Sequence, residues 1–320
     1  MTVIDDFKDM SDFQVTVKDN SISIEDTISE NIKAGANMVL YGPPGTGKTH
    51  TVLSQINLLK EQNIVGEILI IQFHPQYTYQ DFIEGYTFDG SSFEYKPGVL
   101  LKFCDSDQVK NNKDKLHILY IDEINRADLA SVFGELLYLL DRDESKKVIL
   151  PLKGREFSLP KNLLIIGSMN SADKSISLID YALRRRFDFI FVPPSLAGFN
   201  KIIENKKLDD TFDVKKYSRF FQVLNSRILR HPLLGKNMTL GHSMFFSKQK
   251  NISNESVYKA ITSGVLTQIE SYLGAENFPE ISQILSPHIA KNLMYGKSST
   301  LEEIMNLIDI VASSEEEVLF

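Results

Sequence analysis

The chain has 320 residues, enough for one large domain and a second, smaller one, and its 42% apolar and 24% charged residues are ordinary for a globular protein. Its formal net charge of −7 argues against a bulk electrostatic grip on DNA or on anionic membranes. No apolar run is long enough for a transmembrane helix, and the opening MTVIDDFKDM lacks the basic start and apolar core of a secretory signal, so no membrane contact is expected.

The first elements along the chain are a lead-in with one helix and then a series of strands. Residues 1–36 predict a short lead-in and an amphipathic helix around SIEDTISENIKAG. NMVLY (37–41) predicts a short apolar strand that runs into a glycine-rich turn. Continuous apolar runs follow at EILIIQF (67–73), LHILYID (116–122) and NLLIIGSM (162–169), each typical of a strand buried on both faces.

Helical patterns separate these strands, as in DLASVFGELLYLLD (128–141). Strands alternating with helices at this spacing predict an α/β fold, with a parallel sheet covered by helices on both sides. KVILPLKGREFSLP (147–160) predicts a β-hairpin that turns at Lys153 and Gly154.

The composition changes after Pro193 and Pro194, two residues that cannot continue a helix and that stiffen the chain. Residues 195–320 show mostly helical patterns. We therefore predict an α/β domain over residues 37–194, followed by a smaller all-helical domain over residues 195–320.

Cysteine usage indicates the compartment. The single cysteine, Cys104, excludes an internal disulfide and fits the reducing cytoplasm, which is the predicted location. It stands beside Phe103 without a catalytic partner, so a packing role is expected. No pair of histidines or cysteines has the spacing of zinc ligands.

The segment GPPGTGKT matches the phosphate-binding pattern G-x-x-x-x-G-K-[ST]. Its glycines let the backbone curl so that N–H groups point at phosphates, and the following helix N-terminus adds partial positive charge. Lys48 can reach the β- and γ-phosphates, and the Thr49 hydroxyl can ligate Mg²⁺. A strand before the motif and a helix after it are the context that it requires. The predicted nucleotide-binding residues are Gly42, Pro43, Pro44, Gly45, Thr46, Gly47, Lys48 and Thr49.

A second motif, LYIDEIN, places two carboxylates after four apolar residues. Asp122, at the end of a neighbouring strand, is predicted to hold Mg²⁺ together with Thr49 and to contribute to nucleotide binding. Glu123 is predicted to orient or deprotonate the attacking water. A P-loop followed by an apolar strand that ends in Asp-Glu indicates a nucleoside-triphosphate hydrolase rather than a kinase of small molecules.

Asn170 ends the third buried run and has two readings. An asparagine at a strand end is commonly a turn-former. If its strand lies between the P-loop strand and the Asp122 strand, however, Asn170 emerges beside the γ-phosphate, where a neutral amide can hold the lytic water. Taken with the other two motifs, the second reading is preferred.

Three consecutive arginines, Arg184 to Arg186, follow an amphipathic stretch that predicts a helix of about ten residues, roughly 15 Å long. Cations at a helix C-terminus suit the helix dipole, which is one explanation for them. The other is catalytic, because a trans-supplied arginine stabilises the transition state of phosphoryl transfer. The predicted helix would carry Arg185 or Arg186 to the domain edge, where a neighbouring subunit would sit.

The order P-loop, DEINRA, GSMNSAD, DYALRRRF and then a helical lid resembles that of the AAA+ ring ATPases, and most closely the McrB family. That family comprises the GTP-hydrolysing motor subunits of modification-dependent restriction systems. The matching stretches are GPPGTGKT, QFHPQYTYQDFIEGY, IDEINRADLASVFGELLYLL, MNSADKSISLIDYALRRRF and GHSMFF. The resemblance implies an AAA+ fold, GTP or ATP as substrate with Mg²⁺, a homo-oligomeric and expected hexameric ring, and a McrC-like nuclease or stimulator as partner. DNA would be contacted mainly through the complex.

The resemblance also implies residue roles. The N-x-A-D element, associated with guanine-nucleotide use, corresponds to Asn170, Ser171, Ala172 and Asp173. The residue pair Asn125 and Arg126, after the carboxylates, links the active site to the stimulating partner in this family.

Further implied roles concern the subunit boundary and the lid. Asp180 and Arg185 match positions expected to act on the neighbouring subunit's nucleotide, and Arg186 matches a sensor position. His242, in GHSMFF, lies where the helical lid meets the nucleotide. One departure is Lys174, which stands where the family usually has arginine and keeps the charge without the bidentate fork. The chain also begins almost directly at the motor, so DNA recognition is expected to come from another polypeptide or to be absent.

The aromatic segment FHPQYTYQDFIEGY has no catalytic interpretation of its own. Tyr77, Tyr79, Phe82 and Tyr86 alternate with polar residues there. Two explanations stay open, an ordered packing loop between sheet and helix or a contact between subunits.

The leading functional hypothesis is an oligomeric GTPase motor of a restriction or antiphage complex that works with a nuclease partner. The alternative is an ATP-using AAA+ remodeller, similar to the MoxR group, that acts on protein. A third hypothesis, a nucleotide-gated scaffold with negligible turnover, is disfavoured because the residues for hydrolysis are intact: Lys48, Asp122, Glu123 and Asn170.

Overall fold

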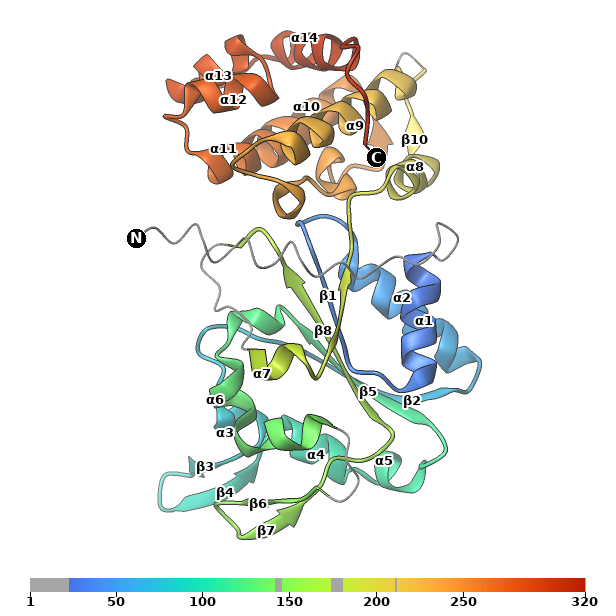
Figure 1. Cartoon of the computed structure of the whole chain (residues 1–320), viewed down its shortest axis with the longest axis vertical. Coiled ribbons are helices and arrows are strands. Elements are labelled where there is room, and N and C mark those ends of the chain that lie inside the picture. The colour runs from blue at the N-terminus through green and yellow to red at the C-terminus, as the bar shows by residue number, and fades with distance from the viewer. Residues whose placement is uncertain (1–22, 142–145, 174–180, 211, 320) are drawn as a thin grey trace. The chain divides into compact units, whose positions relative to one another are not determined.

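The computed structural model describes residues 23–141, 146–173, 181–210 and 212–319, which form two compact units (Figure 1). The first unit comprises the described residues within 23–41, 49–169 and 181–191. The second comprises those within 42–48, 170–173 and 192–319. None of the described helices is both long enough and apolar enough to cross a membrane.

The first unit is built on a parallel sheet whose described strands follow the order β2-β5-β8-β1-β9. In chain order these strands are β1 Met38–Gly42, β2 Val65–Gln72, β5 Leu116–Asp122, β8 Leu163–Asn170 and β9 Asp188–Phe191. The register between β5 and β8 pairs Ile118 with Leu164 and Tyr120 with Ile166. The expectation that the strand of Asn170 lies between the P-loop strand and the Asp122 strand is therefore confirmed.

The central strands are buried, whereas β2 is not. In β8 every residue from Leu163 to Met169 is buried, and β5 is buried over residues 117–121, as their continuous apolar runs predict. The same prediction is wrong for β2, in which Ile70 is 55% exposed. The reason is its position, because β2 is the edge strand and has a neighbour on one side only.

Seven α-helices of the first unit are described, and the first two lie side by side in Figure 1. Ser29 of the first donates a hydrogen bond of 2.9 Å to Gln55 of the second. The predicted N-terminal helix is confirmed, because Ser23 caps its start and Gly35, with φ of 73°, ends it. The helices are α1 Ile24–Ala34, α2 Lys48–Glu61, α3 Tyr79–Phe82, α4 Val99–Asp105, α5 Asp107–Asn111, α6 Leu129–Phe133 and α7 Tyr181–Arg184.

The single helix predicted over residues 128–141 is wrong in one respect. The chain forms α6 and then changes to a 3₁₀ helix, η3 Gly134–Asp141. The break falls at Gly134, whose φ of 51° and ψ of −131° cannot continue an α-helix. A further 3₁₀ turn, η2 Ile124–Arg126, follows β5.

Two antiparallel hairpins extend the first unit, and they lie beside each other (Figure 1). One pairs β3 Glu84–Phe88 with β4 Phe93–Pro97, and the other pairs β6 Val148–Leu150 with β7 Arg155–Phe157. The predicted turn at Gly154, with φ of 61°, is confirmed for the second hairpin. The Leu152 N–H donates 2.8 Å to Glu84 Oε1, which ties the two hairpins together.

The core of the first unit explains two sequence predictions. Phe82 is fully buried and lies 4.9 Å, centroid to centroid, from Phe133, while the Tyr77 ring lies 4.6 Å from the Phe73 ring at an angle of 32°. This part of the aromatic segment therefore packs inside the unit. Burial raises the pKa of the Cys104 thiol to about 12, which keeps it protonated and confirms its packing role.

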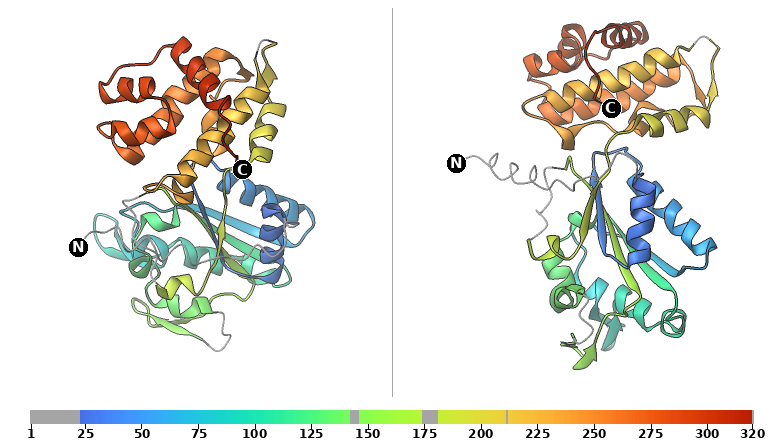
Figure 2. Two further views of the ribbon diagram at one scale, coloured as in Figure 1. Left: turned by 45° about the horizontal axis from the view of Figure 1, so that its top comes forward. Right: turned by 45° about the vertical axis from the view of Figure 1, so that its right-hand side comes forward.

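The second unit contains the helices drawn from yellow to red in Figure 2. They are α8 Leu196–Glu204, α9 Val214–Arg230, η4 Lys236–Met238, η5 His242–Phe245, α10 Asn254–Ala260, the π-helical η6 Ile261–Leu266, α11 Thr267–Leu273, α12 Phe278–Ile284, α13 Pro287–Met294 and α14 Leu301–Ala312. Aromatic rings centre its core, with Phe199 stacked 4.7 Å from Phe221. The prediction of an all-helical part needs a small correction, because β10 Lys207–Leu208 pairs in parallel with β11 Asn251–Ile252. The predicted domain limits at 36/37 and 194/195 stay predictions.

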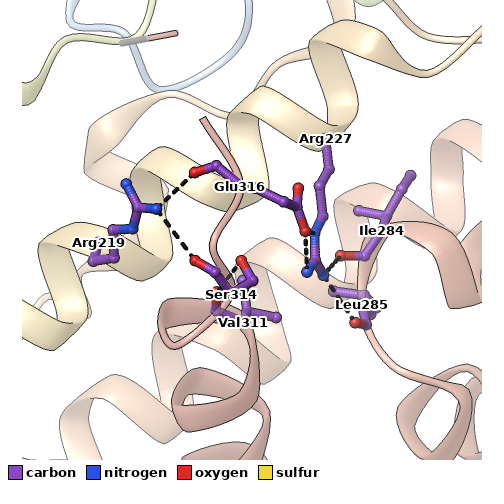
Figure 3. A network of polar contacts seen from close by, with 7 residues as sticks. All are labelled: Arg219, Arg227, Ile284, Leu285, Val311, Ser314 and Glu316. Atoms are coloured by element: carbon purple, nitrogen blue, oxygen red, sulfur yellow. Dashed lines mark hydrogen bonds and ion pairs between the residues drawn. The ribbon is translucent and has the colours of Figure 1, made fainter. Parts of the chain in front are cut away.

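Two arginines of α9 form hydrogen bonds with the segment after α14 (Figure 3). Arg219 donates to the carbonyls of Ser314, at 3.2 Å, and Glu316, at 2.6 Å. Arg227 donates from Nε to Glu316 Oε1 at 2.8 Å and from Nη1 to the Ile284 carbonyl at 3.0 Å. The Arg227 guanidinium holds the pKa of the Glu316 carboxyl below its usual value. Arg227 therefore joins α9, the end of α12 and the segment after α14.

Candidate nucleotide-binding site

The P-loop runs from Gly42, the last residue of β1, to Lys48, the first residue of α2. Gly45 and Gly47 both have φ of 79°, a left-handed conformation that glycine adopts without strain. At Gly42 a Cβ atom would lie 2.4 Å from the Val192 carbonyl oxygen, so no side chain fits there. These glycines are therefore required by the path of the backbone, as the sequence motif predicts.

The Lys48 ammonium lies among three oxygens. Its Nζ atom is 2.9 Å from the Gly42 carbonyl, 2.8 Å from the Pro43 carbonyl and 3.0 Å from Asn170 Oδ1. Lys48 is only 8% exposed, so its charge is held close to the loop. The predicted site residues Lys48 and Asn170 are thus in direct contact.

The next two carbonyls of the loop are also engaged by the protein. The Gly241 N–H donates 3.0 Å to the Pro44 carbonyl, and the Ser243 N–H donates 3.0 Å to the Gly45 carbonyl. The carbonyls of residues 42–45 therefore accept hydrogen bonds from the protein itself. The N–H groups of the loop are the main-chain groups that would bind a ligand. A backbone curl with engaged carbonyls, left-handed glycines and an adjacent ammonium fits a polyphosphate.

A second cluster gathers hydroxyl groups on one carboxylate oxygen. Asp122 Oδ1 accepts from Thr49 Oγ1 at 3.2 Å, from the Tyr120 hydroxyl at 3.4 Å and, in a short contact, from the Ser168 hydroxyl. Burial raises the pKa of Tyr120 to about 12, so this hydroxyl stays protonated and can donate. Thr49 and Asp122 supply the hard oxygen ligands that Mg²⁺ takes, and the donor set fits that ion.

Among the described residues no group of three or more histidine, cysteine, aspartate or glutamate side chains could hold a metal ion. A magnesium ion held by Thr49 and Asp122 would take its other ligands from substrate phosphates and water, as is usual for this ion.

Glu123 follows Asp122 in a strained conformation. Its φ of 52° and ψ of 46° are left-handed, which is uncommon outside glycine and is found at functional sites. Its Oε2 atom forms an ion pair of 3.3 Å with Arg126 Nε. The turn that carries Glu123 also buries Asn125, which is 5% exposed and whose Oδ1 atom has no hydrogen-bond partner in the described part of the chain. Such a buried acceptor is costly to leave unpaired.

The N-x-A-D residues at the end of β8 belong to the second unit and contact other residues of that unit. The Ser171 N–H donates 3.0 Å to the Gly42 carbonyl, and the Ser171 hydroxyl donates 3.0 Å to the Asn237 carbonyl. Ala172 packs against the helical core. Asp173, the fourth residue of this element, also belongs to the second unit.

The arginines differ from one another. Helix α7 ends at Arg184, and Arg185 in the following turn is exposed. Arg186 is nearly buried and donates to Asp141, with Nε 2.7 Å from Oδ1 and Nη2 3.1 Å from Oδ2. Arg186 and, to a smaller extent, Lys146 lower the pKa of the Asp141 carboxyl to about 2. Lys174, Asp180 and most of the predicted ten-residue helix lie outside the described residues.

Two groups near the P-loop were not predicted from the sequence. Ser168 stands two residues before Asn170, so both side chains lie on one face of β8 and the polar residue within IIGSMN was the available signal. Gly241 opens the GHSMFF stretch, but its own contact with Pro44 was not predicted because it joins distant parts of the chain. The neighbouring His242, predicted near the nucleotide, packs its ring near Gly198, and burial lowers its pKa.

Residues 37–187 match the AAA domain family, dynein-related subfamily. The chain is 38% identical over 229 residues to the Type IV methyl-directed restriction enzyme EcoKMcrB subunit of Escherichia coli (strain K12), which covers 69% of this chain and 49% of that protein. It is 26% identical to the Type II restriction enzyme BsuMI component YdiS of Bacillus subtilis (strain 168), which covers 70% of this chain and 76% of that protein. The chain thus spans about half the length of the first relative.

Proposed function

The chain is a McrB-like AAA+ protein, and we propose that it binds a nucleoside triphosphate at its P-loop and hydrolyses it, with GTP preferred over ATP. The observation that supports this proposal is a pair of contacts made by two consecutive residues, Lys48 and Thr49. Lys48 contacts Asn170 at the end of β8, and Thr49 contacts Asp122 at the end of β5. The first two residues of α2 thus each contact a polar residue at the end of a strand.

The binding roles follow from these contacts. The N–H groups of the P-loop and the Lys48 ammonium bind the phosphates. Thr49 and Asp122 hold Mg²⁺, which when bound supplies positive charge at the β- and γ-phosphate oxygens. Ser168 and Tyr120 orient the Asp122 carboxylate through their hydroxyl groups.

The hydrolytic roles belong to Glu123 and Asn170. Glu123 orients or deprotonates the attacking water, and its strained backbone holds the carboxylate at the end of β5. Asn170 contributes a neutral amide that positions the water without adding charge near the phosphates. Its bond with Lys48 fixes that amide relative to the P-loop.

The preference for GTP rests on the match of Asn170–Asp173 to the N-x-A-D element. The proposal about partners is based on the relatives, whose names describe a subunit and a component of restriction enzymes. We infer that this chain works in a multi-subunit restriction complex as a homo-oligomeric, hexameric ring with a McrC-like nuclease. DNA is contacted mainly through that complex, and Asn125 and Arg126 connect the site to the partner. Arg185, which is exposed, acts on the nucleotide of the neighbouring subunit.

The test is hydrolysis of GTP and of ATP by the purified chain, with and without the product of the neighbouring gene. Preferential turnover of GTP, stimulated by that product, is the expected result. Preferential turnover of ATP that the product does not change would favour a MoxR-like remodeller. Undetectable turnover of both nucleotides would contradict the enzymatic role itself.

A further inference from the structure

Residues Lys236–Phe245 of the second unit form hydrogen bonds with the P-loop, and we call them the bridging segment. Its Gly241 and Ser243 N–H groups donate to the Pro44 and Gly45 carbonyls, each at 3.0 Å. The segment therefore holds two consecutive peptide groups of the P-loop.

The contact between the bridging segment and the P-loop is close. A Cβ atom on Gly241 would lie 2.0 Å from the Gly45 carbonyl carbon, and a Cβ atom on Gly45 would lie 2.7 Å from Met244 Cγ. The first distance is to a main-chain atom, so the backbones of Gly241 and Gly45 touch directly, and the second shows that side chains of the bridging segment also pack against Gly45. A small shift of the bridging segment would therefore be felt at Gly45.

The bridging segment is in turn held by one side chain of α9. Asn225 is fully buried, and its Oδ1 atom accepts from the Leu240 N–H at 2.6 Å. Its Nδ2 atom donates to the Leu240 carbonyl at 3.1 Å and to the Phe221 carbonyl at 3.2 Å. The amide thus satisfies both polar backbone groups of Leu240, the residue directly before Gly241.

The chemistry of Asn225 is specific to an amide. Leu240 is itself fully buried, so its N–H and carbonyl would lose their partner with any apolar side chain at position 225. An aspartate would keep the acceptor, but its second oxygen would face the carbonyls of Leu240 and Phe221. An amide is the side chain that both accepts and donates at this position.

We propose that Asn225 is a positioning residue for nucleotide binding. Through Leu240 it holds Gly241 and Ser243 against the P-loop carbonyls, which fixes the curl of the loop before the phosphates arrive. Asn225 touches no part of the nucleotide. A loop whose shape is fixed in advance loses less conformational freedom on binding, so the contribution appears in affinity. This inference rests on the proposed nucleotide binding at the P-loop.

The experiment measures the affinity of the full chain for mant-GTP and mant-ATP, together with kcat and KM for the unlabelled nucleotides. Asn225→Asp should raise Kd and KM about tenfold, because one buried hydrogen bond is worth roughly that factor. The kcat value at saturating nucleotide should change by less than about threefold, since bound nucleotide restores the loop.

A matched control lies in the same unit. Asn292 of α13 donates to Ser299 Oγ at 3.3 Å and to Glu303 Oε2 at 3.4 Å, and neither partner belongs to the bridging segment. Asn292→Asp should leave the Kd for mant-GTP within about twofold of the wild-type value, because it leaves the P-loop contacts intact. An equal loss of affinity in both variants would show a general effect of the helical unit and overturn the role of Asn225.

A second variant covers the case in which Asn225→Asp does not fold. Gly241→Ala leaves the Asn225 amide in place but drives the bridging segment away from Gly45. It should raise Kd by at least the same factor, and wild-type affinity in this variant would overturn the proposal. Failure of the wild-type chain to bind either nucleotide would overturn the proposed function as well, whereas wild-type binding with unchanged variants overturns only the role of Asn225.

Discussion

Lys48 Nζ lies 3.0 Å from Asn170 Oδ1, so the ammonium of the P-loop and the amide at the end of β8 are hydrogen-bonded although 122 positions separate them in the chain. The bond exists because β8 is the direct neighbour of β1 in the sheet. It brings the residue predicted to bind phosphate and the residue predicted to hold water into one contact. The first prediction below concerns the ammonium.

Lys48→Ala should abolish nucleotide binding. The substitution removes the side-chain cation of the P-loop together with its hydrogen bonds to the Gly42 and Pro43 carbonyls. We expect a loss of affinity of about 100-fold or more, from charge-assisted hydrogen bonds worth about 1.5–3 kcal/mol each. Equilibrium binding of mant-GTP checks this. Lys60→Ala, an exposed change at the other end of α2, is the control and should bind as the wild-type chain does.

Glu123→Gln should retain nucleotide binding and lose hydrolysis. Glutamine keeps the shape of the side chain but removes the carboxylate that would accept a proton from water. We expect kcat to fall by about 10²–10⁴-fold, the usual contribution of a general base, with Kd nearly unchanged. Steady-state release of phosphate and binding of mant-GTP give the two values. Turnover at the wild-type rate would show that another group activates the water.

Mixing two inactive variants should restore part of the activity. Lys48→Ala lacks the binding cation, and Arg185→Ala lacks the exposed arginine that we propose acts on the neighbouring subunit. In a mixed ring some interfaces pair an intact P-loop with an intact Arg185. Hydrolysis should therefore appear on mixing, and activity per chain should rise with protein concentration. If both variants assemble and mixing restores nothing, Arg185 acts within its own subunit or only caps its helix.

Arg186 should affect stability at acid pH, unlike its neighbour. Its guanidinium, together with the Lys146 ammonium, lowers the pKa of Asp141 from 3.8 to about 2, so the folded state favours the ionised carboxylate. The resulting stability is present above pH 3.8 and is lost as the pH falls toward 2. The free energy of unfolding should therefore fall more between pH 4 and pH 2.5 in the wild-type chain than in Arg186→Ala. Arg185→Ala should keep the wild-type dependence, and equal slopes for all three proteins in urea titrations would contradict the assignment.

The strands and the P-loop could be predicted because their signals are local. Apolar runs marked β5 and β8, and the spacing of glycines marked the turn between β1 and α2. The same signal located β2 but predicted it to be buried on both faces, since the apolar run does not reveal that a strand lies at the edge. We did not predict β9, although a short run of aromatic and β-branched residues begins at Phe189, shortly after the arginines and before Pro193.

The candidate site was predictable only in its named residues. Lys48, Thr49, Asp122 and Asn170 stand in motifs, and the structure brings Lys48 to Asn170 and Thr49 to Asp122. No sequence motif indicates the hydrogen bonds between Asn225 and the backbone of Leu240. They depend on tertiary contacts alone, because the two residues are brought together only by the fold. The left-handed backbone of Glu123 was equally hidden, since no glycine marks it.

The contact between Gly241 and the P-loop limits how this sequence can change over evolutionary time. A methyl group at Gly241 meets main-chain atoms of Gly45 and Pro44, which are the same whatever side chains those positions carry. A second substitution at Gly45 or Pro44 would not remove this clash. We therefore expect position 241 to keep glycine as the sequence changes. Gly198 offers the contrast, because the three atoms nearest to a methyl group there all belong to the imidazole ring of His242, which a shorter side chain would remove. Two glycines of one chain thus differ in whether a compensating partner exists, and a library that randomises each with its neighbours should recover paired changes at position 198 and glycine alone at position 241.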